Sequence, residues 1–131
     1  MKSITWKEFF ELLEKIKFQD FDLIVAIANN GIIPAAFIQQ KLKIPMKIIK
    51  INYRDENNNP TYDDAILLEK DEFTIKGKRI LLVDDVSRTG KTISKAKEYL
   101  DGNPIKTFVI NGKADYSMFN QEECIGMPWK A

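Results

Sequence analysis

The sequence contains no histidine, and this absence excludes several kinds of catalysis. A Ser-His-Asp triad, an imidazole general base and a zinc site with histidine ligands all need that side chain. Any chemistry carried out by this chain must therefore depend on carboxylates, lysine, tyrosine, a hydrated metal ion or the positioning of substrates.

Cysteine, long apolar runs and excess charge are also scarce. Cys124 is the only cysteine, so an intramolecular disulfide is excluded. No apolar run has the length of a membrane span, and acidic residues stand where a signal peptide would have its apolar stretch. With 20 Lys and Arg against 19 Asp and Glu, the net charge of +1 gives no reason to expect nucleic acid as a partner. We expect one cytoplasmic domain over residues 1–131.

The most informative segment is 80–92, ILLVDDVSRTGKT. Its four apolar residues, 80–83, predict a strand buried on both faces of a parallel sheet, and 91–100 can form the helix that follows. The loop between them then lies at the carboxyl end of a strand, where ligands collect in α/β sheets. The free N–H groups at the start of the helix favour phosphate. The loop is therefore predicted to bind an anion, although it also holds Asp84 and Asp85.

Two adjacent carboxylates repel each other, so they need hydroxyl donors, a metal ion or a nearby cation. A sugar phosphate, with or without a hydrated divalent cation, meets the needs of both the acids and the loop. The alternative is a solvated strand end with an Asp helix cap, but that explanation does not require Thr89, Gly90 and Thr92. A Walker A loop is excluded because Asp85 stands where that pattern needs glycine.

This segment resembles the signature of the type I phosphoribosyltransferases, which is an apolar run, two acids and a short loop ending in T-G-x-T. The resemblance implies a site for phosphoribosyl pyrophosphate (PRPP). Asp84 and Asp85, as the catalytic pair, would meet the ribose hydroxyls and the shell of a Mg²⁺ ion, with Asp85 holding the metal directly or through water. The implied PRPP-binding residues that follow are Val86, Ser87, Arg88, Thr89, Gly90, Lys91 and Thr92.

Strand and helix patterns alternate along the rest of the chain. Thr5 and Glu8 have the spacing of a capping box, after which Trp6, Phe9, Phe10, Leu13 and Ile16 fall on one helical face. The fold class predicted is α/β, a single-domain three-layer parallel sheet with flanking helices, a short C-terminal hood and a flexible flap. The predicted strands are 22–28, 46–53, 80–83 and 105–110, and the predicted helices are 6–16, 32–42 and 91–100.

The loop Ala28-Asn29-Asn30-Gly31 occupies the place of the pyrophosphate loop of the family. The basic residue usual there is absent, which should weaken pyrophosphate binding. Gly31 and the two asparagines can adopt positive φ angles and turn their amides towards an anion. An ordinary strand-to-helix turn rich in Asn and Gly is the other interpretation.

The polar segment between residues 53 and 71 is predicted to be a flap. In the family, a flexible loop here closes over the sugar and excludes water. Tyr53, Arg54 and Tyr62 are the candidates to contact a ligand on closure. The alternative, which does not conflict with a flap, is a hairpin formed by residues 65–69 and 72–76.

Two C-terminal segments resemble bacterial xanthine-guanine-type purine phosphoribosyltransferases. Residues 112–116, GKADY, resemble K-P-D-Y, and residues 127–129, MPW, resemble F-P-W. The resemblance implies that Lys113 donates to a purine 6-oxo group and that the backbone near Ile125 receives the other edge of the base. Lys113 could equally be a solvated surface charge. Trp129 is expected to pack against the domain rather than on a ligand.

Arg88 is the main departure from that pattern, because oxopurine enzymes usually have Asp there to accept the proton at N7. Arginine cannot accept a proton, and loss of such a group costs about 10²- to 10⁴-fold in rate. Three functions remain open. The first is a magnesium-dependent transferase acting on PRPP and a base, with a purine expected, and the second is a PRPP- or nucleotide-binding protein without turnover. The third is a phosphatase or nucleotide hydrolase. The family also implies a homo-oligomer, a dimer or a tetramer.

Overall fold

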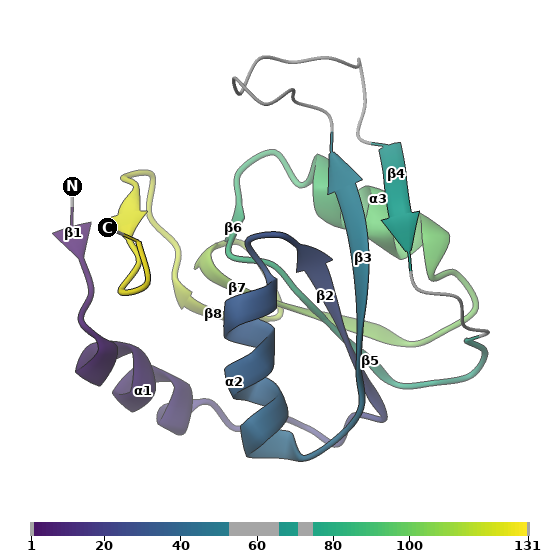
Figure 1. Cartoon of the computed structure of the whole chain (residues 1–131), viewed down its shortest axis with the longest axis horizontal. Coiled ribbons are helices and arrows are strands. Elements are labelled where there is room, and N and C mark those ends of the chain that lie inside the picture. Colours follow the sequence, from purple (N-terminus) through teal and green to yellow (C-terminus); the bar gives the residue numbers. More distant parts are fainter. Residues whose placement is uncertain (1, 53–65, 71–74, 131) are drawn as a thin grey trace.

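The computed structural model describes residues 2–52, 66–70 and 75–130 (Figure 1). A seven-stranded sheet has the order β4-β3-β2-β5-β7-β6, and β8 pairs with β7 outside this path. Its strands are β2 (Leu23–Ala28), β3 (Met46–Asn52), β4 (Ile66–Lys70), β5 (Ile80–Val83), β6 (Val86–Ser87), β7 (Ile105–Gly112) and β8 (Tyr116–Phe119). The helices are α1 (Trp6–Lys15), α2 (Ile32–Leu42) and α3 (Lys91–Tyr99).

The sheet is mostly parallel, as predicted. β3, β2, β5 and β7 all run in the same direction, with Leu23 opposite Ile80 and Ile80 opposite Ile105. The exception is β4, which pairs antiparallel with β3. Residues 66–70 thus pair with β3. Residues 65 and 71–74 lie outside the described residues, so the predicted hairpin of 65–69 with 72–76 stays a prediction. The flap candidates Tyr53, Arg54 and Tyr62 lie outside the described residues.

The core forms two layers because successive residues of the central strands face opposite sides of the sheet. Ile24 and Ala26 of β2 pack on the side of α2, together with Ile38. Val25 and Ile27 pack on the side of α3, together with Leu100, which follows that helix. α2 and α3 thus cover opposite faces of the sheet (Figure 1). The three-layer α/β architecture expected from the sequence is confirmed.

Helix α1 begins with the predicted capping box. The Thr5 hydroxyl accepts from the Glu8 N–H at 3.1 Å, and the Glu8 carboxylate accepts from the Thr5 N–H at 3.2 Å. Phe9 and Leu13 are buried, but Trp6 and Phe10 remain 41% and 44% exposed. The predicted apolar face of this helix is therefore only partly covered by the rest of the chain.

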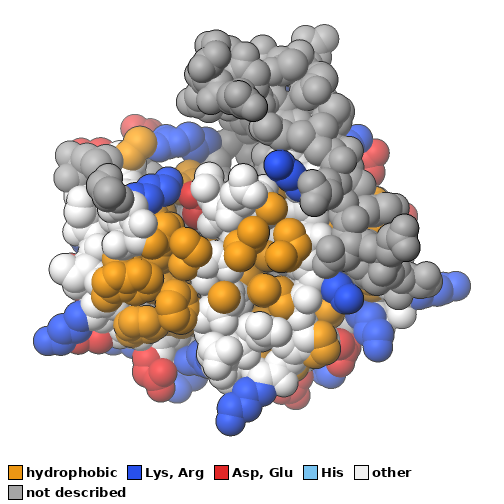
Figure 2. Space-filling model, viewed as in Figure 1, with side chains coloured by type: hydrophobic (Ala, Val, Ile, Leu, Met, Phe, Trp, Pro, Cys, Tyr) orange, Lys and Arg blue, Asp and Glu red, His pale blue; other side chains and the backbone are white. Residues whose placement is uncertain are grey.

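An aromatic cluster joins α1 to α2 and to the C-terminal segment. Its members are Trp6, Phe9, Phe10, Phe37 and Trp129, with neighbouring ring centroids 5.1 to 6.2 Å apart. Figure 2 shows hydrophobic side chains gathered on this face of the molecule, in the region of α1 and α2. The expectation that Trp129 packs against the domain is confirmed.

The two ends of the described chain meet in a short second sheet. β1 (Lys2–Ser3) pairs parallel with β9 (Ile125–Gly126), so that Lys2 lies opposite Ile125. Figure 1 shows the N-terminal strand beside the C-terminal segment. None of the described helices is long and apolar enough to cross a membrane.

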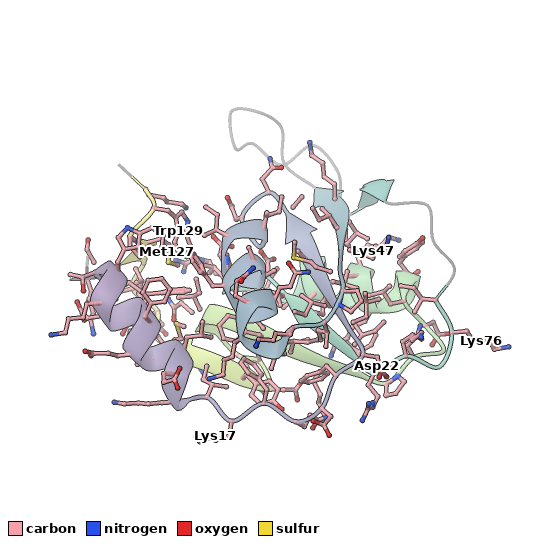
Figure 3. All side chains as sticks on the ribbon, turned by 60° about the horizontal axis from the view of Figure 1, so that its bottom comes forward. Lys17, Asp22, Lys47, Lys76, Met127 and Trp129 are labelled. Atoms are coloured by element: carbon pink, nitrogen blue, oxygen red, sulfur yellow. The ribbon has the colours of Figure 1, made fainter. Side chains whose placement is uncertain are left out.

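An ion pair between Asp22 and Arg79 joins the segments just before β2 and β5. Asp22 lies on the side of the molecule away from Met127 and Trp129 (Figure 3). Arg79 donates to the Asp22 carboxylate from its backbone N–H at 2.9 Å, from Nε at 3.0 Å and from Nη2 at 2.9 Å. These hydrogen bonds hold the pKa of Asp22 well below its ordinary value. Because the pair is open to solvent, we expect it to contribute little to stability.

Candidate active site

Asp84 and Asp85 follow β5 directly, and both are buried, with 8% of each residue exposed. The Asp85 N–H donates to the Asp84 carboxylate at 2.8 Å, and the Val86 N–H donates to the Asp85 carboxylate at 2.7 Å. β7 fixes their backbone, since the Asp85 carbonyl accepts from the N–H groups of Ile110 at 2.8 Å and Asn111 at 3.1 Å. The acid pair is therefore held rigidly at the carboxyl end of the sheet.

The pKa of Asp84 is raised well above its ordinary value. Burial is the main cause because it penalises the charged form, and the neighbouring charge of Asp85 adds to it. A bound cation or a set of hydroxyl donors would relieve this penalty. The buried pair is thus suited to a ligand that brings one of these.

The predicted loop and the acid pair line one cleft of about 590 Å³. Gly90 has a left-handed backbone (φ 79°) and is the N-cap of α3. This places the first turn of α3 at the cleft, where its backbone N–H groups favour an anion, although that of Lys91 donates to the Thr89 hydroxyl at 3.3 Å. The cleft is lined by every predicted residue from Asp84 to Thr92, together with Asn30, Ile93, Asn111, Cys124, Ile125, Met127 and Lys130.

The loop before α2 differs from the prediction in its backbone. Gly31 has φ −81° and is the N-cap of α2, and among described residues other than glycine only Lys43 has positive φ. The predicted positive φ angles in this loop are therefore wrong. The Ala28–Asn29 peptide bond is cis. Asn30 lines the cleft, whereas Asn29 is exposed and neither Ala28 nor Asn29 is among the described lining residues.

Glycine is needed at position 31 because the backbone of β2 and β5 comes very close. A Cβ atom there would lie 2.5 Å from the Val83 carbonyl oxygen, 2.6 Å from that of Ile27 and 3.1 Å from the Asp84 Cα. Only a hydrogen atom fits, so Gly31 lets the start of α2 pack directly on the strand that carries the acids. The loop keeps a place beside the cleft by close packing rather than by unusual φ angles.

Arg88 lines the same cleft as the acid pair and hydrogen-bonds the C-terminal segment. Its Nη1 donates to the Glu122 carbonyl at 3.3 Å, and its Nη2 donates to the Cys124 sulfur at 2.9 Å. Among the residues that the structure describes, no carboxylate forms an ion pair with Arg88. The residue that departs from the family pattern thus links the loop of residues 86–92, the predicted PRPP loop, to the other wall of the cleft.

Asn111 is a site residue that the sequence reasoning missed. It is only 2% exposed and lies in β7, where its Oδ1 accepts from the Gln121 N–H at 3.0 Å and its Nδ2 donates to the Glu123 carbonyl at 3.1 Å. The signal available was a polar residue directly after the apolar run of 105–110 and before Gly112. A polar residue at the carboxyl end of a central strand, like Asp84, lies at the edge of the sheet where ligands bind.

The two residues predicted to bind the base lie in different places. Ile125 is buried and lines the cleft. Lys113 is exposed and is not among the described residues that line either this cleft or the adjacent hollow of about 420 Å³. Its base-binding role stays a prediction.

The acidic side chains of the cleft fit a Mg²⁺ ion that is shared with a substrate better than a metal ion that is bound by side chains alone. In the part of the chain that the structure describes, no group of three or more Cys, Asp or Glu side chains could hold a metal ion. Mg²⁺ usually keeps several waters and binds one or two carboxylates together with the phosphates of a substrate. Asp85, with Asp84 beside it, could supply those carboxylates.

The fold and this site define a phosphoribosyltransferase domain. A family model described as "Phosphoribosyl transferase domain" matches residues 6–125, and the chain belongs to this family. An orotate phosphoribosyltransferase from Saccharolobus solfataricus is 39% identical over 103 residues, which are 75% of this chain and 48% of that protein. The bifunctional protein PyrR of Ligilactobacillus salivarius is 34% identical over 109 residues, 76% of this chain and 61% of that protein.

Among solved structures, a purine phosphoribosyltransferase from Pyrococcus horikoshii is similar over almost the whole chain. It has a TM-score of 0.80 and 29% sequence identity, and the match covers 99% of this chain and 94% of that one. By contrast, the chain spans about half the length of the orotate phosphoribosyltransferases from S. solfataricus and Sulfurisphaera tokodaii, at 48% and 47%. The type I phosphoribosyltransferase resemblance read from residues 80–92 is confirmed.

Proposed function

We propose that the protein is a magnesium-dependent phosphoribosyltransferase that moves ribose 5-phosphate from PRPP to a nitrogenous base and releases pyrophosphate. The observation that supports this most directly is the cleft itself. It brings a buried acid pair, a helix N-terminus with its Thr-Gly-Lys-Thr loop, and Asn30 of the second loop around one space. These are the groups that a sugar carrying both a phosphate and a pyrophosphate would need.

In this proposal, each part of the cleft holds one part of PRPP. Asp84 and Asp85 accept hydrogen bonds from the ribose hydroxyls, and the N–H groups from Ser87 to Thr92 bind the 5-phosphate. Asn30 lies where the pyrophosphate would leave. Magnesium, when bound, neutralises the charge that grows on this leaving group. The base nitrogen bonds to the sugar carbon as the bond from that carbon to the pyrophosphate oxygen breaks.

A purine is the acceptor that we propose. The support is the resemblance of residues 112–116 and 127–129 to purine enzymes, together with the similarity to the Pyrococcus purine phosphoribosyltransferase over 99% of the chain. Because Arg88 cannot accept the N7 proton, we expect transfer to 6-oxopurines to be about 10²- to 10⁴-fold slower than with a positioned acid.

A second candidate is a PRPP- or nucleotide-binding protein without useful turnover. The contacts of Arg88 support it, since this side chain binds Glu122 and Cys124 at the wall of the cleft. The exposed Asn29, which replaces a cation, points the same way.

The test is calorimetric titration of PRPP with and without Mg²⁺, followed by a screen of bases for pyrophosphate release. We expect magnesium-dependent binding and release that requires added base, which a phosphatase or hydrolase would not need. Asp85→Asn should weaken PRPP and Mg²⁺ binding together, whereas Asp101→Asn, an exposed acid just beyond α3, should change neither. Unchanged PRPP affinity in Asp85→Asn would refute the assignment.

The resemblance also implies a location in the cell and an oligomeric state. We propose a cytoplasmic homo-oligomer, a dimer or a tetramer, without a nucleic-acid or membrane partner. The half-exposed aromatic rings of Trp6 and Phe10 are compatible with association. Light scattering of the purified protein would determine its mass in solution.

A further inference from the structure

The segment between β8 and β9, residues 120–124, forms a wall of the cleft, and we call it the acceptor loop. It leads directly into Ile125, which lines the cleft, and it carries Cys124, which is exposed there. Four consecutive residues of this loop, 121–124, are hydrogen-bonded by two side chains, those of Asn111 and Arg88.

Asn111 holds the loop from the sheet. Both functions of its buried amide are used, one on the Gln121 N–H and one on the Glu123 carbonyl. A buried amide that satisfies two backbone groups is costly to replace, because each group left without a partner keeps its full desolvation penalty. Asn111 therefore fixes the position of the acceptor loop relative to β7.

Arg88 holds the same loop from the segment that follows the acid pair. It belongs to the PRPP loop, and its guanidinium binds the Glu122 carbonyl and the Cys124 sulfur. The main cleft and the adjacent hollow of about 420 Å³ share four lining residues, which are Val86, Ser87, Arg88 and Asn111. Arg88 and Asn111 thus lie at the boundary between the main cleft and the hollow. The acceptor loop must stay in place there if the cleft is to remain closed towards the hollow.

We propose that Arg88 and Asn111 are a pair of positioning residues that clamp the acceptor loop and so set the affinity for the acceptor base. The part of this proposal that concerns the acceptor depends on the proposed transferase function, whereas the clamp itself does not. Arg88 is then not a substitute for the missing acid. In place of a contact to the base, it supplies hydrogen bonds between the PRPP loop and the acceptor loop.

The clamp is tested first in the free protein, through the reaction of Cys124 with iodoacetamide, a neutral reagent. The thiolate is the reacting form and a nearby guanidinium favours it, so the rate compared in every variant is the limiting rate at high pH, where the thiolate fraction no longer differs between variants. Cys124 is the only cysteine, so the rate reports this position alone. Arg88→Met removes both hydrogen bonds from an exposed position and should raise the rate about tenfold, the factor expected for loss of a hydrogen bond to a charged group. Lys130→Met removes another cleft cation that is not bound to the loop and should leave the rate unchanged. An equal rate in Arg88→Met and wild type would overturn the clamp.

The second test is steady-state kinetics with the base found by the screen. Arg88→Met and Asn111→Asp should each raise the KM for the base about tenfold while the KM for PRPP stays within about twofold. Arg88→Lys, which keeps one charged donor, should recover part of the loss. If both KM values rise together, the residues support the whole site and the acceptor proposal is wrong.

Arg88→Asp separates the clamp from the simpler explanation that only the N7 contact is missing. The clamp predicts a higher KM for the base and a faster Cys124 reaction, because aspartate cannot donate to Glu122 and Cys124. A gain of purine transfer with an unchanged Cys124 rate would overturn the proposal. Absence of turnover with every base would refute the transferase, while the Cys124 rates would still decide the clamp.

Discussion

Replacing Gly31 by alanine is the sharpest test of how the fold holds the acid pair. The added Cβ would lie 2.5 Å from the Val83 carbonyl oxygen, about 0.9 Å closer than the 3.4 Å at which ordinary contact begins. It would meet the Ile27 carbonyl oxygen at 2.6 Å as well. Both atoms are backbone atoms of buried strands, so neither can rotate away, and α2 must move off the sheet.

The expected cost follows from overpacking. Extra atoms in a packed interior cost about 1–3 kcal/mol, and a clash with two fixed carbonyls belongs at the upper end. For a chain of this length, about 3 kcal/mol lowers the melting temperature by roughly 10 °C. Since the same Cβ lies 3.1 Å from the Asp84 Cα, PRPP affinity should fall too.

The matched control is Gly102→Ala. Gly102 has φ 92° with no atom within 4 Å of an added Cβ, so the change costs only the left-handed backbone conformation, about 1–2 kcal/mol. Thermal and urea unfolding followed by circular dichroism would compare the variants, and PRPP titration would follow. The reasoning fails if Gly31→Ala is as stable as wild type or less damaging than Gly102→Ala, or if Gly102→Ala weakens PRPP binding equally.

Two further predictions concern stability. The pKa of Asp84 is raised in the folded state, so stability present below the ordinary pKa of 3.8 is lost as the pH rises through the raised value. Asp84→Asn cannot ionise and should be more stable than wild type in urea unfolding at neutral pH, but not at pH values below 3.8; equal stability at neutral pH would contradict this. Thr5→Ala removes the cap of α1 and should cost about 1 kcal/mol in urea unfolding. Most of that cost should remain in a Glu8→Ala background, because the Thr5 hydroxyl accepts from the backbone N–H of residue 8, which the substitution keeps. Loss of the cost in that background would argue against this cap.

The sequence allowed the centre of the fold and most of the cleft to be predicted because their signals are local. Strand β5, the acid pair and the loop into α3 form one continuous segment, in which apolar run, charge and turn chemistry agree. The partner of β4 was not predictable in the same way. Residues 66–70 have strand character, but nothing in their local sequence indicates that they pair with β3, because that pairing depends on which edge of the sheet is open.

The parts of the site that could not be predicted depend on contacts between distant segments. Nothing in the sequence near Arg88 indicates that its guanidinium binds Glu122 and Cys124, which lie far along the chain. Gly31 was predicted for its freedom of φ, yet the reason for glycine is the backbone of a neighbouring strand. Helical periodicity likewise identified the apolar face with Trp6 but could not show how much of it other elements cover.

The pairing of β1 with β9 has a consequence for synthesis on the ribosome. Ile125 is made long after its partner Lys2, so this contact has a large sequence separation. The PRPP loop, whose strand and helix are adjacent in sequence, can form early. The wall of the cleft formed by the acceptor loop and Ile125 must wait until both paired segments have left the exit tunnel, so nascent chains halted before Ile125 should lack this wall.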